Sequence, residues 1–412
     1  MFKGIRIYWF VVFMAFLATA LSFLDWQVLS VSIIKIKEDF PISDTDYGLI
    51  NTGFLISYAI MFTLGGILID RFGSRKGLGF SVALWSLATA MHSLANNVFH
   101  FGIFRFFLGL GEGGAFPGAI KAVVEWVPKK KQALANGIAI GGAALGAVVA
   151  PPLCVYLIAS IGWRGVFVVT GLFGLVWALV WFLIPKNEEN LNNKSEKNYK
   201  SWEETFRAVG KILKIREVWI FIMIRFILDP IFYFYMFWIP KYLSDSRGVD
   251  LVKIGELFWI PFLALGISNM LGGFLSDKIF RRTASLDWAR KGVMGIAAIL
   301  TLSALFVKYV PSEEWVIFIM VLAFFAHGLW ITNYITAISD TFGQSITSTV
   351  IGLSGTAGAL SSVLINPLMG KIIGNYSYDP MWIYSGLMYP LAFILFIVLM
   401  PKVRQLDYLP TV

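Results

Sequence analysis

Long apolar runs separated by short polar segments make up most of this chain of 412 residues. A helix needs about 20 mainly apolar residues to cross the hydrocarbon core of a bilayer. Twelve runs fit that length, with approximate limits 8–33, 47–69, 77–95, 99–125, 133–160, 163–184, 217–243, 251–275, 291–309, 314–338, 347–373 and 378–400. The pattern predicts an all-α integral membrane protein with twelve transmembrane helices.

Composition argues against a soluble protein. Hydrophobic residues form 58% of the chain and charged residues only 14%, whereas a soluble domain carries about 25% charge. The net charge of +9 is spread over short segments between the apolar runs, where basic residues set membrane orientation. We therefore expect the lipid bilayer, and not nucleic acid, as the large partner of this chain.

Cysteine and histidine usage argues against an enzyme. The chain has one cysteine, Cys154, and three isolated histidines, which form neither a disulfide framework nor a metal-ligand spacing. No glycine-rich phosphate loop follows a strand, and no segment resembles a nucleophile elbow. We expect no cofactor, no metal and no catalytic residue.

The apolar runs fall into two groups of six. Residues 1–185 hold the first group and residues 216–412 the second, and the polar segment 186–215 between them is predicted to be a cytoplasmic linker. The first run could be a signal peptide, but its apolar pattern continues to Ile34, well past the small residues at 18–20. We interpret it as the first membrane span.

Basic residues lie on one side of the predicted membrane. Segments 70–76, 127–132 and 276–291 each carry three or more Lys or Arg, whereas the opposite segment 92–98 carries none. The positive-inside rule places the basic segments in the cytoplasm. We therefore predict a multi-pass protein of the cell (inner) membrane with both termini cytoplasmic.

The two groups of runs repeat one another. Residues 65–71 (GGILIDR) recur 207 positions later as 272–278 (GGFLSDK), and residues 135–153 align without a gap to 350–368, 215 positions later. Two matches in the same order and at nearly the same offset indicate a duplicated six-helix unit. Many secondary transporters are built in this way, around a site near the bilayer midplane.

The segment 65–76 resembles the cytoplasmic loop motif of the major facilitator superfamily, and 272–282 resembles its second copy. The glycines of the motif let two helices approach closely. Its aspartate can bind exposed amides at a helix end and pair with the arginines. We assign gating and structural roles, and not substrate contact, to Asp70, Arg71, Arg75 and Asp277.

Four further segments resemble the anion:cation symporter branch of that superfamily, in particular bacterial hexuronate and galactonate transporters. They are 24–31 (LDWQVLSV), 105–118 (RFFLGLGEGGAFPG), 225–243 (RFILDPIFYFYMFWIPKYL) and 326–343 (AHGLWITNYITAISDTFG). The resemblance implies two pseudo-symmetric halves and proton-driven uptake of sugar acids. We also expect a monomer.

Three ionisable side chains lie at membrane depth in the first half, namely Asp25, Arg105 and Glu112. Even lenient scales put the cost of such a charge at about 2.5–3.5 kcal/mol, so each is a functional candidate. Arg105 and Glu112 are seven residues apart and share one face of the predicted fourth helix. An arginine can hold a carboxylate by two hydrogen bonds, and a carboxyl group in apolar surroundings can load and release a proton near neutral pH. Anion–proton coupling needs this set, and a static ion pair is the alternative.

The resemblance assigns proton coupling to Asp25 and Glu112, and substrate binding to Arg105 and Tyr58. The branch usually has arginine after the first-helix aspartate, where this chain has Trp26. A tryptophan can stack on a sugar but cannot neutralise a carboxylate, so Trp26 is a candidate substrate contact of a different kind. The difference predicts a substrate that is less charged than a typical hexuronate, or one bound in another pose.

The second half carries one pair of charges and several polar or aromatic side chains at membrane depth. Arg225 and Asp229 lie four residues apart before a helix-breaking proline. They either neutralise one another or act in substrate binding or gating. Along the tenth run His327, Trp330 and Asn333 recur every three residues and so face a cavity or another helix, with packing as the alternative for His327. The candidate substrate contacts in this half are Tyr233, His327, Trp330 and Asn333.

These residues together predict a proton-coupled secondary transporter that imports a small organic anion, a sugar acid such as a hexuronate or aldonate, by alternating access. An exchanger or facilitator for another carboxylate or a less charged sugar derivative is an alternative of the same class. A non-transporting membrane sensor would need an output domain, and a membrane-embedded enzyme would need a metal or nucleophile cluster. We expect neither feature.

Overall fold

The structure, a computed structural model, describes residues 7–128, 131–184, 207 and 209–406, without the side chains of residues 63, 70, 133, 344 and 345. The chain divides into two compact units, Met1–Lys200 and Ser201–Val412. Most of the predicted linker 186–215 lies outside the described residues, so its limits stay a prediction.

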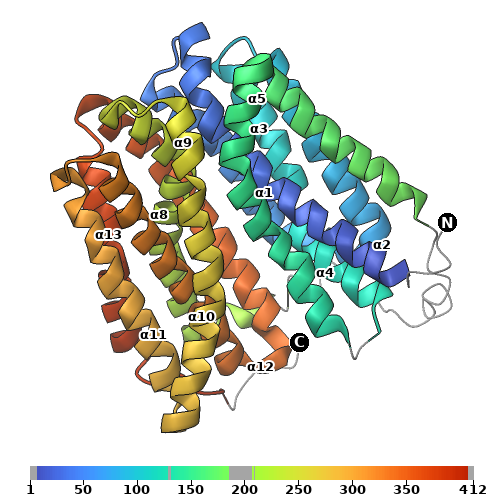
Figure 1. Cartoon of the computed structure of the whole chain (residues 1–412). Coiled ribbons are helices and arrows are strands. Elements are labelled where there is room, and N and C mark those ends of the chain that lie inside the picture. Colours follow the sequence, from blue (N-terminus) through green and yellow to red (C-terminus); the bar gives the residue numbers. More distant parts are fainter. Residues whose placement is uncertain (1–6, 129–130, 185–206, 208, 407–412) are drawn as a thin grey trace. The chain divides into compact units, whose positions relative to one another are not determined.

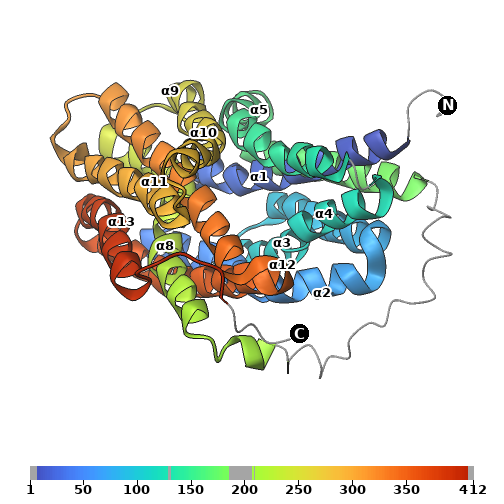
Figure 2. The ribbon, with the colours of Figure 1, turned by 90° about the horizontal axis from the view of Figure 1, so that it is seen from below.

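The first unit is helical throughout its main described elements (Figure 1). They are α1 (Ile7–Asp39), α2 (Asp44–Met91), the short 3-10 helix η1 (His92–Leu94), α3 (Val98–Glu112), α4 (Ala115–Trp126) and α5 (Gln132–Leu183). Helix α1 packs along α5, and α2 packs against α3. Figure 2 shows α1 beside α5 from below.

Two glycines bend the long helices of this unit. Gly73 in α2 and Gly162 in α5 have φ angles of 75° and 74°, a left-handed conformation that glycine adopts without steric cost. Each glycine divides one helical stretch into two arms of membrane length. The segment 70–76, predicted to be a loop, is therefore helical on both sides of Gly73.

The predicted fourth span, 99–125, is not a single helix. Helix α3 ends at Glu112, and α4 begins after a break at Gly113 and Gly114. The backbone is close to α2 here, because a Cβ atom on Gly113 would lie 2.2 Å from Cβ of Met61. Close helix packing thus requires a glycine at this point, and two consecutive glycines weaken a helix.

The second unit is also helical in its main described elements. They are α8 (Arg216–Arg247), α9 (Leu251–Leu257), α10 (Trp259–Thr283), α11 (Leu286–Thr301), the 3-10 helix η4 (Leu302–Tyr309), α12 (Glu313–Asn375) and α13 (Asp379–Leu399). Helix α12 bends at Gly343, with a φ of 60°, and packs against α8 and α10.

Each unit supplies six membrane-length segments. In the first unit they are α1, the two arms of α2, α3 with α4, and the two arms of α5. In the second they are α8, α9 with α10, α11 with η4, the two arms of α12, and α13. Eight stretches of the described chain are long and apolar enough by themselves to cross a membrane, with the bent α5 counted once. The all-α, twelve-span fold predicted from the sequence is confirmed.

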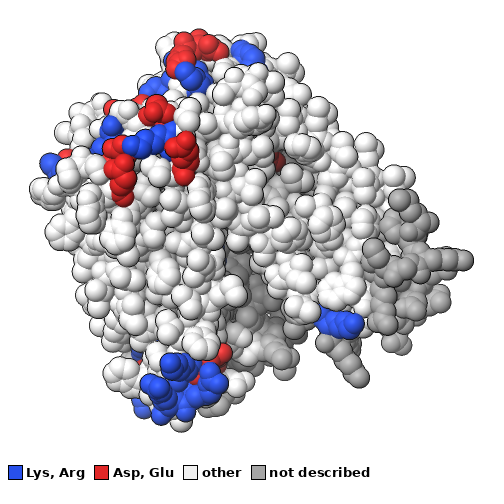
Figure 3. Space-filling view, in the orientation of Figure 1, with Lys and Arg blue, Asp and Glu red and all other residues white. Residues whose placement is uncertain are grey.

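The surface of the second unit separates charged from apolar regions. In Figure 3 its Lys, Arg, Asp and Glu side chains gather at two ends, and the face between them is uncharged. The basic end lies where α10 meets α11, and α10 carries Arg281 and Arg282 in its last turn. Large apolar side chains such as Met270 and Leu364 are exposed. Such an apolar surface suits lipid rather than water.

The two units repeat one another in their contacts as well as in their sequence. In the first unit the hydroxyl of Ser74 donates to Glu125 Oε2 at 2.5 Å. In the second, 216 and 215 positions later, Nε of Arg290 donates to Asp340 Oδ2 at 2.8 Å. In the first unit, an acidic residue near the end of the fourth membrane segment thus binds the start of the third. In the second unit, an acidic residue near the end of the tenth segment binds the start of the ninth in the same way.

A second repeated contact joins the middle of the fourth segment to the second, and the middle of the tenth segment to the eighth. A Cβ atom on Gly109 would lie 2.3 Å from Oγ of Ser57, and one on Gly328 would lie 1.8 Å from Oγ of Ser268. Both glycines let a helix lie directly against a serine of its neighbour. The duplication indicated by the sequence therefore extends to helix packing.

Candidate functional site

The three ionisable residues of the first half form one buried cluster in the first unit. Asp25 lies in α1 and is 4% exposed, while Arg105 and Glu112 lie in α3 and are 0% and 1% exposed. The guanidinium group of Arg105 interacts electrostatically with both carboxyl groups, which also interact with each other. Among the Asp, Glu, Lys and Arg side chains described in this unit, these three alone are buried.

Trp26 links α1 to this cluster. Its indole Nε1–H donates a hydrogen bond to Oε2 of Glu112. The other oxygen of Glu112, Oε1, and Oδ1 of Asp25 have no hydrogen-bond partner among the described residues. Buried polar atoms are nearly always hydrogen-bonded, so these two oxygens are places where a proton, a water molecule or a ligand hydroxyl can bind.

Aromatic rings from α1 and α2 surround the charges. The Trp26 ring packs edge-on against Phe54 and Tyr58, with centroids 5.3 and 5.4 Å apart. Cζ of Arg105 lies 5.5 Å from the centroid of Phe54. Tyr58, a predicted substrate contact, therefore belongs to the same cluster as Arg105 and Trp26.

Asn51 is a candidate that the sequence reasoning missed. It is fully buried in α2, and neither atom of its side-chain amide has a hydrogen-bond partner among the described residues. It lies three residues before Phe54 and seven before Tyr58, so all three occupy one face of the helix. That spacing, with a polar residue in an apolar run, was the available signal.

In the second unit Arg225 and Asp229 form an ion pair within α8. Nε of Arg225 lies 2.9 Å from Oδ2 and 3.2 Å from Oδ1 of Asp229. The two residues also line a small pocket. The other lining residues are Ile224, Leu228, His327, Trp330, Ile331, Tyr334 and Tyr389. The pair neutralises itself and still borders a cavity, so both interpretations drawn from the sequence stay open.

His327 and Trp330, two predicted substrate contacts, lie in this pocket. Nδ1 of His327 is 2.5 Å from the hydroxyl of Tyr389, and its ring stacks on Phe232 with centroids 4.3 Å apart. Trp330 packs edge-on against Tyr389, with centroids 5.5 Å apart. Both rings are thus held by neighbours of the second unit.

Asn333 and Tyr233 are not among the residues that line this pocket. Nδ2 of Asn333 donates to the carbonyl of Gly272 at 3.2 Å and to that of Leu329 at 2.9 Å, which joins the tenth segment to the glycine motif of the eighth. Tyr233 is buried and stacks on Phe237, with centroids 5.7 Å apart. A substrate role for either residue stays a prediction.

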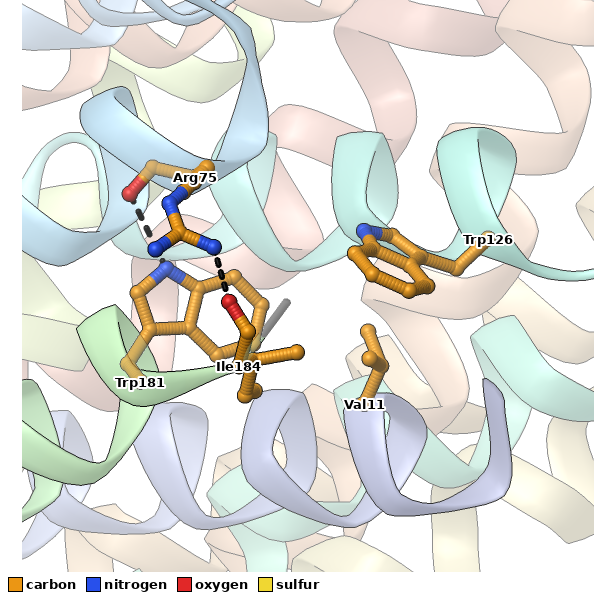
Figure 4. A pocket seen from close by; sticks show the side chains of 5 residues that line it. All are labelled: Val11, Arg75, Trp126, Trp181 and Ile184. Carbon is orange, nitrogen blue, oxygen red and sulfur yellow. Dashed lines mark hydrogen bonds between the residues drawn. The ribbon is translucent and has the colours of Figure 1, made fainter. Parts of the chain in front are cut away.

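Arg75 of the first motif holds the end of α5 (Figure 4). Its guanidinium group donates to the carbonyl of Ile184 and, at 2.5 Å, to that of Phe182, while the indole of Trp181 donates to the carbonyl of Arg75 at 3.0 Å. These bonds satisfy the last carbonyls of the helix, and its C-terminal dipole favours a cation there. Side chains from α1 and α4 complete a small pocket beside Arg75.

The remaining motif residues lie at the surface or outside the described set. Arg71 is exposed, and the side chain of Asp70 is not among those described. Asp277 is 71% exposed, with its carboxylate 3.8 Å from Arg290. Lys291, 216 positions after Arg75, donates to the carbonyl of Pro401 at 2.8 Å, just past the end of α13.

The sequence profile of the Major Facilitator Superfamily matches residues 15–365, which is most of the chain. The chain belongs to this superfamily. It is therefore a multi-pass membrane transporter, as predicted, and not an enzyme.

Relatives in the superfamily match over nearly the whole chain. The hexuronate transporter of Escherichia coli (strain K12) is 26% identical over 393 residues, covering 92% of this chain and 90% of the relative. The probable galactarate/D-glucarate transporter GudP of the same strain is 27% identical over 434 residues, with coverage of 98% and 95%. The probable sulfoacetate transporter SauU of Cupriavidus necator is 29% identical over 379 residues, with coverage of 89% and 87%.

Solved structures share the fold. A bacterial homologue of the human lysosomal transporter Spinster, in an inward-facing and occupied conformation, aligns with a TM-score of 0.75 and 20% identity over 97% of this chain and 98% of its own. A D-xylose–proton symporter aligns with a TM-score of 0.75 and 17% identity, covering 96% and 99%.

Proposed function

We propose that this protein is a proton-coupled secondary transporter that imports a sugar acid by alternating access. We place it in the inner membrane with both termini in the cytoplasm. Relatives named as hexuronate, galactarate/D-glucarate and D-galactonate transporters support the substrate class. The basic segments 70–76, 127–132 and 276–291 support the orientation.

The buried cluster of Asp25, Arg105 and Glu112 is the observation that carries the proposal. Arginine offers a planar set of donors that matches a carboxylate. The two carboxyl groups each have an oxygen with no partner among the described residues, so each can take up a proton. Buried ionisable groups inside a membrane protein mark ion or substrate pathways.

The proposed cycle follows from charge balance. When Asp25 and Glu112 are protonated, Arg105 carries the net charge of the cluster and attracts the substrate carboxylate. Rearrangement of the two six-helix halves then exposes the loaded cluster to the cytoplasm. Loss of the protons restores two negative charges beside Arg105, which compete with the substrate and release it.

Uptake into proteoliposomes under an imposed pH gradient tests this proposal. With radiolabelled hexuronates and aldonates, an acidic exterior should drive accumulation by the wild type. The double variant Asp25→Asn, Glu112→Gln should lose accumulation and retain counterflow, because both acidic positions are then permanently neutral and Arg105 keeps its positive charge. Glu256→Gln, at an exposed position of α9, serves as the matched control and should behave as the wild type.

Other outcomes identify the alternatives. Counterflow without accumulation in the wild type would indicate an exchanger or facilitator. Binding of sugar acids without either activity would indicate a sensor. A pH response that is unchanged in the double variant would refute the role of the two carboxyl groups in coupling.

A further inference from the structure

Trp26 has a fixed position within the cluster. Its ring stacks on Phe23 at a centroid distance of 5.2 Å and an interplanar angle of 7°, and packs edge-on against Phe54 and Tyr58. Only 3% of its surface is exposed. Its N–H group, the single donor of an indole, points to Glu112. Glu112 therefore receives a neutral hydrogen-bond donor from position 26.

The charge of the first unit's cluster depends on a single cation. Among the described residues of this unit, Arg105 is the one buried Lys or Arg side chain. When Asp25 and Glu112 are both protonated, the cluster carries one positive charge. One carboxylate brings this charge to zero, and a second carboxylate makes it negative.

In the described part of the second unit, the buried and partly buried cations have acidic partners, with the exception of Arg247, which donates to the hydroxyl of Tyr242 and to the carbonyls of Val307 and Val310. The pairs are Arg225 with Asp229, Lys241 with Asp245, Lys253 with Glu313, Arg290 with Asp340, and Lys291 with Asp287. An ion pair that is already formed offers little net charge to a further anion. These ion pairs therefore do not supply the charge that a second carboxylate requires.

We propose that Trp26 determines the charge of the accepted substrate. By giving Glu112 a neutral donor that adds no positive charge, it restricts the site to polyhydroxy acids with one carboxylate and disfavours diacids of the same carbon skeleton. The inference rests on the proposed function, and it divides the acids named for the relatives into an accepted and a rejected class. Trp26 acts here as a specificity-determining residue.

The expected discrimination follows from the cost of a charge without a counter-charge in a low-dielectric site. That cost corresponds to about a hundredfold in affinity. Hydroxyl groups carry no such cost, because Glu112 Oε1, Asp25 Oδ1 and the amide of Asn51 have open hydrogen-bonding positions among the described residues.

The test compares acids that share a carbon skeleton and carry one or two carboxylates. The purified full chain is titrated at pH 7 with D-gluconate, D-glucuronate and D-glucarate, and with the corresponding galactose-derived acids, and thermal unfolding reports binding because a ligand of the folded state raises its stability. At least one monoacid should bind about a hundredfold more tightly than the diacid of its skeleton. Proton-driven uptake is measured in parallel.

Two variants separate charge from shape. Trp26→Arg supplies a second cation. It should therefore reduce the ratio of the monoacid's affinity to the diacid's affinity at least tenfold. Trp26→Phe removes the donor without adding charge, so it should weaken both acids alike and leave the ratio unchanged. Trp26→Lys replaces Trp26→Arg if the latter fails to fold, and the wild-type ratio decides the question by itself.

The outcomes distinguish this inference from the proposed function. A wild type that binds and imports diacids as well as monoacids would overturn the inference alone. Binding of neither class would overturn the proposed function and the inference together. A ratio that narrows as much in Trp26→Phe as in Trp26→Arg would show that Trp26 acts by shape and not by charge.

Discussion

The two units share a scaffold but treat buried charge differently. The contact of Gly109 with Ser57 in the first unit has its counterpart in that of Gly328 with Ser268 in the second. Arg105 lies four residues before Gly109 and Glu112 three after it, whereas Phe324 and Ile331 have these spacings from Gly328. The first unit therefore holds a cluster of charges with open hydrogen-bonding positions, and the second holds ion pairs and aromatic rings.

This difference indicates that both units kept the helix packing after duplication but differ in their buried charges. Helix packing is set by glycines and small residues, which both units retain because every helix contact depends on them. Among the described residues, the cluster of three buried charges occurs in the first unit alone. We expect substitutions of buried charge in the first unit to affect transport, and substitutions of paired charge in the second to affect stability first.

The largest effect is expected for Arg105→Gln. Loss of the cluster's cation removes the charge-assisted hydrogen bonds to the substrate carboxylate, so uptake and binding should fall about a hundredfold or more while the fold persists. Radiolabelled uptake and thermal-shift titration measure this. Arg164→Gln, at a partly buried arginine that stacks on Trp163 with Cζ 4.2 Å from the ring centroid, is the matched control. If uptake by Arg105→Gln stayed within tenfold of the wild type, the claim that the buried charges of the first unit act in transport would be wrong.

Breaking the ion pair of the second unit is expected to have the next largest effect. Asp229→Ala leaves Arg225 without its acidic partner and should destabilise the protein by about 3 kcal/mol, whereas the double variant Arg225→Met, Asp229→Ala should recover most of that loss. Unfolding in denaturant, followed by tryptophan fluorescence, gives the difference. If the double variant lost as much free energy of unfolding as Asp229→Ala, the pair would have a role beyond mutual neutralisation.

The two repeated glycine contacts should respond alike. Gly109→Ala and Gly328→Ala each place a methyl group within 2.3 Å of a serine Oγ, so each should cost about 1–3 kcal/mol through overpacking. Gly66→Ala is the control, since nothing lies within 4 Å of its Cβ position. The unfolding temperatures of the three variants are measured and compared with that of the wild type. Tolerance of only one of the two contact variants would show that the repeated packing is not equivalent.

The smallest effects are expected at the helix ends. Arg75→Gln removes a cation from the last carbonyls of α5, and Lys291→Gln removes one from a carbonyl just past the end of α13; each change should cost about 0.3–1 kcal/mol. The two losses should be similar, because the residues lie 216 positions apart and each binds a carbonyl near the end of a helix. Thermal unfolding at low salt measures both. A markedly larger loss of uptake than of stability in Arg75→Gln would support its predicted gating role.

The sequence by itself determined the class of fold, the number of spans, the duplication and the three charges at membrane depth. These follow from properties that are local along the chain. An apolar run of sufficient length must cross the bilayer as a helix because its backbone groups have no water to bind there. The cost of Asp25, Arg105 and Glu112 in such runs marks them without any knowledge of their neighbours.

Only the tertiary structure decided what those residues contact. The bond from Trp26 to Glu112 joins positions 86 residues apart, and the break after α3 arises where Gly113 meets Met61 of α2. The carbonyls bound by Arg75 were likewise not evident in the sequence. Hydrogen bonding and close packing act between atoms a few ångströms apart, and the distance between two segments is fixed only when the helices have packed together.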